Sequence, residues 1–198
     1  MSMLRVFIAV ELPREIQKAI SQVIERLQAT AGKSVVRWVS ASNIHLTLKF
    51  LGDIAPSNLG VIEEVLKSEA GLHSCFRIEA GALGAFPNTK RPRVIWLGVD
   101  APPELTSLQR GIESATAKLG YASEARPFSP HLTLGRVREN ASTTELSALS
   151  SKLNEVRFDS PGSFEVDAVH LFKSDLLPGG SVYTRLFSTS LLKLTDKE

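Results

Sequence analysis

The sequence NIHLTLKFLG at residues 43–52 and the sequence SPHLTLGR at residues 129–136 share the tetrapeptide His-Leu-Thr-Leu. The chain has four histidines in 198 residues, and half of them lie in this repeated motif. The chance that such a tetrapeptide recurs in a chain of this composition is on the order of a few in a thousand, so internal duplication is the better explanation. The paired histidines are therefore the feature of this sequence that matters most.

Each motif is expected to form a β-strand, in which successive side chains point to opposite faces of the sheet. The histidine and threonine of each copy then share one face, while the two leucines are buried on the other and fix the register. On the first strand the same alternation places Lys49 on the histidine face. Two such strands, related by approximate twofold symmetry, would bring both polar pairs to one cleft. These pairs are His45 with Thr47 and His131 with Thr133.

The segments around the motifs repeat in the order strand, helix, motif strand, helix, strand. The motifs lie 86 residues apart, and a proline-containing loop at 85–92 joins the two halves. We predict one domain over residues 1–198, made of pseudo-repeat lobes at about 1–86 and 92–198. The pattern predicts strands at 4–10, 35–39, 44–51, 76–83, 93–99, 131–137, 164–172 and 182–192, and helices at 13–31, from 57, at 102–119 and at 144–156.

Composition excludes few classes of function. With 43% hydrophobic and 22% charged residues the chain is globular, and a net charge of +2 permits a polyanionic partner without requiring one. Cys75 is the only cysteine, which excludes an internal disulfide and a cysteine-based zinc cluster and fits a reducing cytoplasm. The apolar run at 4–10 is too short to span a membrane. The sequence contains no long coiled-coil heptad pattern that would favour assembly, so we expect a monomer.

Two histidines that face one reacting centre can act as general acid and general base near neutral pH. A phosphodiester suits this arrangement, because the threonine hydroxyls can donate hydrogen bonds to its non-bridging oxygens. The scheme requires no metal or other cofactor. A zinc site would need three or four ligands, and neither motif brings a further ligand at suitable spacing. Either motif alone would be read as a packing feature, and His73 and His170 are assigned no role.

Other segments accompany the motifs: VRWV at 36–39, Phe86-Pro87, RVIWLG at 93–98 and LFKS at 171–174. With the motifs they resemble the two-histidine phosphoesterases, and among these the RNA 2′,3′-cyclic phosphodiesterases historically called 2′-5′ RNA ligases. The resemblance implies a duplicated, bilobal α+β fold, with two antiparallel or mixed sheets facing a central cleft and helices on the outer faces. It also implies metal-free hydrolysis of an RNA 2′,3′-cyclic phosphate to a 2′-phosphomonoester, with His45 as proton donor and His131 as proton acceptor.

The resemblance suggests further substrate contacts. Arg136 occupies a family position five residues after the second motif histidine and is expected to clamp phosphate. Strict alternation would send it to the wrong face, unless a β-bulge near Gly135 re-aims it. Lys49 could add positive potential beside His45, with a surface lysine as the plainer interpretation. Phe128 could stack on a nucleobase.

Two alternative functions stay open at this stage. A ligase would join a 2′,3′-cyclic phosphate end to a 5′-hydroxyl end through the same transition state, with an RNA hydroxyl in place of water. A non-catalytic RNA-binding module would need the aromatic and cationic residues but not two proton-transfer groups. The substrate is expected to be RNA, such as tRNA fragments or short oligonucleotides, and the sequence does not choose among them.

Overall fold

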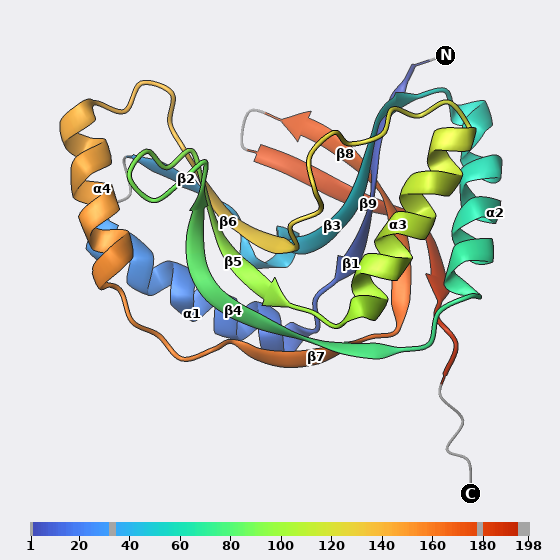
Figure 1. Cartoon of the computed structure of the whole chain (residues 1–198). Coiled ribbons are helices and arrows are strands. Elements are labelled where there is room, and N and C mark those ends of the chain that lie inside the picture. The colour runs from blue at the N-terminus through green and yellow to red at the C-terminus, as the bar shows by residue number, and fades with distance from the viewer. Residues whose placement is uncertain (1, 32–34, 178–179, 194–198) are drawn as a thin grey trace, which may run out of the picture.

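The computed structural model describes residues 2–31, 35–177 and 180–193. In these residues nine strands form one curled sheet in the order β7-β4-β5-β6-β3-β1-β8-β9, with β2 paired to β6 (Figure 1). The pairings within the sheet are antiparallel. The strands are β1 (Leu4–Glu11), β2 (Val36–Trp38), β3 (His45–Ile54), β4 (Phe76–Phe86), β5 (Val94–Asp100), β6 (His131–Val137), β7 (Gly162–Val166), β8 (Ala168–Leu177) and β9 (Gly180–Ser190).

Two helix pairs cover the outer side of the sheet, and each pair takes one helix from each half of the sequence. Helix α1 (Arg14–Ala31) contacts α4 (Thr143–Glu155), and α2 (Leu59–Ala70) contacts α3 (Pro103–Lys118) (Figure 1). Apolar residues recur at helical spacing and are buried against the sheet, as Ile16, Ile20 and Leu27 are on α1. Among the described residues, no helix combines the length and the apolar character that crossing a membrane would require.

The α+β class and the antiparallel strands are confirmed, but the two expected sheets are joined into one. The join lies at the motifs, where Leu46 of β3 pairs with Leu132 of β6. Both leucines are fully buried, so that the repeated apolar pair holds the two motif strands side by side at the centre of the sheet. The two halves of one sheet therefore take the place of two facing sheets.

The two halves of the sheet exchange their outer strands. Strand β4 follows the first motif in sequence but pairs with β5, and β8 follows the second motif but pairs with β1. The prediction of a single strand at 164–172 is wrong. The segment is interrupted at Asp167, so that β7 pairs with β4 in one half and β8 pairs with β1 in the other. Strand propensity marks extended backbone but not the neighbour to which it bonds. The duplication of lobes 1–86 and 92–198 stays a prediction.

The sheet buries apolar side chains on both faces near β1. Val6, Ile8 and Val10 belong to the large core beneath the helices, while Phe7 and Ala9 form a small cluster with Phe172. We call the side of the sheet that carries Phe7, and that lies opposite the helices, the open face. The histidines of both motifs lie on this face.

Candidate active site

The two polar pairs meet at the centre of the open face. Since Leu46 pairs with Leu132 in antiparallel register, His45 lies toward Thr133 and Thr47 lies toward His131. All four polar side chains are partly exposed, whereas the leucines between them are buried. The prediction that the fold brings both pairs together is thus confirmed.

Each imidazole is oriented by the backbone of the residue two positions earlier. The Nδ1 atom of His45 lies 2.9 Å from the Asn43 carbonyl oxygen, and that of His131 lies 2.7 Å from the Ser129 carbonyl oxygen. A carbonyl only accepts, so Nδ1 carries the hydrogen in both rings. In the neutral ring Nε2 is then an acceptor, and in the charged ring a donor. In both histidines Nε2 is therefore the ring atom that can gain or lose a proton.

His45 lies in an aromatic cage formed by three strands. Its ring stacks on Phe7 with centroids 4.6 Å apart, meets Tyr183 edge-on at 5.1 Å and lies 6.4 Å from Phe172. Burial among these rings disfavours the charged imidazolium and lowers the pKa of His45 to about 4, although the Asn43 carbonyl partly opposes the shift. In the free protein His45 is neutral at pH 7.

His131 has a corresponding but more open aromatic neighbourhood. Phe86 meets its ring edge-on with centroids 4.9 Å apart, and Trp96 lies 6.3 Å away. The Trp96 ring lies over Gly84 so closely that a Cβ atom there would come within 2.1 Å of it. Glycine at this position therefore lets the indole pack flat beside the second motif.

A β-bulge in β6 brings Arg136 to the open face. Thr133 pairs with Trp96 and Gly135 with Ile95, so that Leu134 is the extra residue. The bulge reverses the alternation, and Leu134 and Gly135 are both buried while Arg136 is exposed. The bulge expected near Gly135 is thus present, and Arg136 shares the face of His131.

A β-bulge at the corresponding position of β3 turns Lys49 away from the open face. Thr47 pairs with Ala9 and Lys49 with Ile8, which leaves Leu48 as the extra residue. Lys49 therefore lies beneath the sheet and is only 5% exposed, while Phe50 reaches the open face and is 64% exposed. The prediction that Lys49 lies beside His45 is wrong, because strict alternation fails at the bulge. Lys49 therefore does not lie where it could contact a substrate on the open face.

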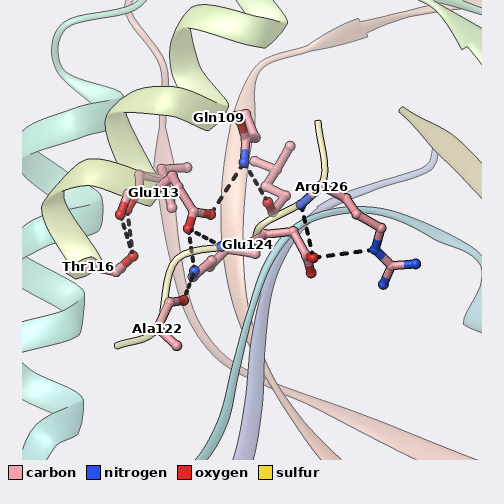
Figure 2. A network of polar contacts seen from close by, with 9 residues as sticks. Gln109, Glu113, Thr116, Ala122, Glu124 and Arg126 are labelled. Atoms are coloured by element: carbon pink, nitrogen blue, oxygen red, sulfur yellow. Dashed lines mark hydrogen bonds and ion pairs between the residues drawn. The ribbon is translucent and has the colours of Figure 1, made fainter. Parts of the chain in front are cut away.

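Lys49 is instead the centre of a buried polar network. Its Nζ donates to Glu113 Oε1 on α3 and to the Ala122 carbonyl, both at 2.5 Å. Figure 2 shows Glu113 between Gln109 and the loop, where its Oε1 also accepts from the Glu124 amide at 2.9 Å. This network fastens the loop at 119–130, which leads into β6, to the strand of the first motif.

Phe128, in the same loop, is partly buried against the large core. Its stacking on a nucleobase stays a prediction. Among the residues that the structure describes, no three His, Cys, Asp or Glu side chains gather in a way that could hold a metal ion.

Sequence reasoning missed most of the residues around the histidines. Phe7 and Tyr183 are distant from His45 in sequence and carry no local signal that links them to it. Asn43 also binds the β8–β9 hairpin, since its Nδ2 donates to the Ser181 carbonyl at 3.0 Å. Its place two residues before the histidine was the one signal that could have indicated a positioning role.

The matches to known proteins cover most of the chain. The model of the 2′-5′ RNA ligase superfamily matches residues 9–176. A protein of Methanothermobacter thermautotrophicus named RNA 2′,3′-cyclic phosphodiesterase is 35% identical over 180 residues, which are 91% of this chain and 95% of the relative. A protein of the same name from Archaeoglobus fulgidus is 34% identical over 183 residues, which are 92% of this chain and 98% of the relative.

Two solved structures are similar in fold and sequence. TT0787 of Thermus thermophilus superimposes with a TM-score of 0.79 at 28% identity, covering 94% of this chain and 97% of that one. Escherichia coli LigT, solved in complex with 3′-AMP, gives a TM-score of 0.70 at 30% identity, covering 96% of this chain and 98% of that one.

Proposed function

Because the chain belongs to the 2′-5′ RNA ligase superfamily, we propose that its open face hydrolyses RNA 2′,3′-cyclic phosphate ends to 2′-phosphomonoesters. The observation that carries this proposal is the convergence of two His–Thr pairs, each with Nδ1 held by a backbone carbonyl and Nε2 left for chemistry. A module that only binds RNA has no use for two oriented proton carriers. The chain is accordingly an enzyme that acts on phosphodiesters.

The reaction assigns one proton transfer to each histidine. His131 Nε2 accepts a proton from water as the water oxygen bonds to phosphorus. The bond between phosphorus and O3′ breaks, and His45 Nε2 donates a proton to the departing O3′. The hydroxyls of Thr47 and Thr133 donate hydrogen bonds to the non-bridging oxygens, on which negative charge increases in the transition state. The product carries a 2′-phosphate and a free 3′-hydroxyl.

The low pKa of His45 requires that the ring take up a proton from solvent once the substrate has bound. A ring with a pKa of about 4 is deprotonated at pH 7, and it can serve as donor only when a nearby anion favours the imidazolium. The negatively charged phosphate supplies that anion. The expected sequence is binding of the nucleotide, protonation of His45 and then donation to O3′.

This sequence predicts a pKa that depends on ligand. NMR titration of the His45 ring should give a value near 4 in the free protein and a higher one when a nucleoside 2′-monophosphate is bound. If the His45 pKa stays near 4 in the complex, the two histidines must exchange roles, with His45 as the base.

The test of the function itself is a product assay. The purified protein is incubated in excess EDTA with a short RNA that ends in a 2′,3′-cyclic phosphate, and the product isomer is identified. We expect a 2′-phosphate product that forms despite the chelator. No product, or activity that returns only when metal is added, would contradict the metal-free mechanism.

Ligation opens the same cyclic phosphate at the same groups with a different nucleophile, and the family description favours it as the second candidate. An RNA 5′-hydroxyl then takes the place of water, and the two histidines serve the same transition state. We further propose that the substrates are the ends of short oligonucleotides or tRNA fragments. We also propose that the protein acts as a monomer in the cytoplasm, where its single thiol, Cys75, stays reduced.

A further inference from the structure

Two arginines lie directly opposite each other beside the second motif. Strand β2 pairs with β6 in the register Val36–Val137, Arg37–Arg136 and Trp38–Gly135. Side chains of directly opposed residues lie on the same face, with Cβ atoms about 5 Å apart. Arg37 and Arg136 are therefore neighbours on adjacent strands.

The neighbours of Arg37 show which face this is. A Cβ atom on Gly135 would point beneath the sheet, 2.7 Å from Val36 Cγ1 and 3.0 Å from Trp38 Cε3. Val36 and Trp38 thus flank the buried side, and Arg37 between them points to the open face, where it is exposed. The arginine pair extends the face of His131 and Thr133 toward the far end of β6.

The positive charge of this pair has no compensating carboxylate in the described part of the chain. The ion pairs of residues 2–31, 35–177 and 180–193 are Lys49–Glu113, Lys67–Glu64, Arg126–Glu124, Lys173–Asp175 and Arg185–Glu11. Like charges directly opposed across two strands are destabilising. A bound anion would relieve this repulsion, and a guanidinium pair suits a phosphate in particular.

We propose that Arg37, together with Arg136, binds the phosphodiester on the 5′ side of the terminal nucleotide, next to the reacting cyclic phosphate. The pair lies beyond Thr133 along β6, and the phosphate that we assign to it is the neighbour of the one between the His–Thr pairs. Arg37 makes the enzyme specific for oligoribonucleotides over nucleoside 2′,3′-cyclic monophosphates. The inference rests on the proposed function, because it takes the reacting phosphate to lie between the motifs.

The test compares substrates that differ by one phosphate. For a dinucleotide ending in a 2′,3′-cyclic phosphate, Arg37→Ala should lower kcat/KM about tenfold. For the nucleoside 2′,3′-cyclic monophosphate, kcat/KM should be unchanged. For a dinucleotide with a neutral methylphosphonate linkage, wild type and Arg37→Ala should have the same kcat/KM. For the dinucleotide, the kcat/KM of Arg37→Lys, which keeps the charge, should lie between the values of wild type and Arg37→Ala. Arg26→Ala, on the exposed side of α1, is the matched control and should behave as wild type.

The outcomes separate this inference from the proposed function. Equal losses on the dinucleotide and the monophosphate would overturn the subsite, since Arg37 would then serve the reacting phosphate or the fold. No loss on either substrate would overturn it too. Binding of a dinucleotide with a 2′-phosphate end, measured by calorimetry, tests the subsite without turnover. About tenfold weaker binding by Arg37→Ala would support the subsite even if the wild type proved inactive, and equal binding would refute it.

Discussion

Replacement of either motif histidine by alanine, His45→Ala or His131→Ala, is expected to lower kcat for a 2′,3′-cyclic phosphate RNA by about 10²–10⁴-fold. Each change removes one of the two Nε2 atoms that exchange protons with the substrate, while the buried leucines that hold the strands stay in place. The measurement is the steady-state rate of 2′-phosphate formation. Unfolding transitions of the variants should stay cooperative, because neither side chain belongs to the large core.

The double variant should be little worse than the more damaged single one, because the two groups serve one transition state and their effects are not additive. His73→Ala is the matched control, since it removes a histidine outside both motifs and should keep wild-type turnover. A loss smaller than about tenfold for either motif histidine would mean that proton transfer is not assigned as we propose.

Glu113→Ala is expected to lower the free energy of unfolding by about 3–5 kcal/mol. The substitution leaves the Lys49 ammonium buried with only the Ala122 carbonyl as a partner, and it removes the acceptor of the Glu124 amide. Lys49→Met should lower the free energy of unfolding less than Glu113→Ala does, because it removes the buried ammonium instead of leaving it without its carboxylate partner. Denaturant unfolding measures both changes, and the double variant gives their coupling.

The exposed pair of Lys67 and Glu64 is the control for this prediction. Its N–O distance is also 2.5 Å, but both side chains are more than half exposed, so Glu64→Ala should cost less than about 1 kcal/mol. A comparably small effect of Glu113→Ala would show that the buried network does not hold the loop at 119–130. Since that loop leads into the strand of His131, partial loss of turnover should accompany its release.

The motifs show both the reach and the limit of reasoning from sequence. The duplicated His-x-Thr pattern predicted the strands, the shared face and the candidate reacting side chains, because leucine burial fixes alternation over these four residues. Alternation then fails at the same place in each copy, where Leu48 and Leu134 are the extra residues of two bulges. In the second copy a bulge was expected near Gly135 because of Arg136. The same assumption in the first copy would have predicted that Phe50 lies on the open face and that Lys49 is buried.

Local patterns in the sequence predict the α+β class, the two His–Thr pairs and the family, since these depend on periodicity and on residues that are close in the chain, whereas the sheets were left as antiparallel or mixed. The exchange of strands between the halves, the side of the sheet that Lys49 occupies and the rings around His45 depend instead on contacts between residues that are distant in the chain. Phe7 and Tyr183 reach that histidine through strand pairing. The pKa of His45 follows from the burial they create, because desolvation depends on everything packed around a group and not on its neighbours in sequence.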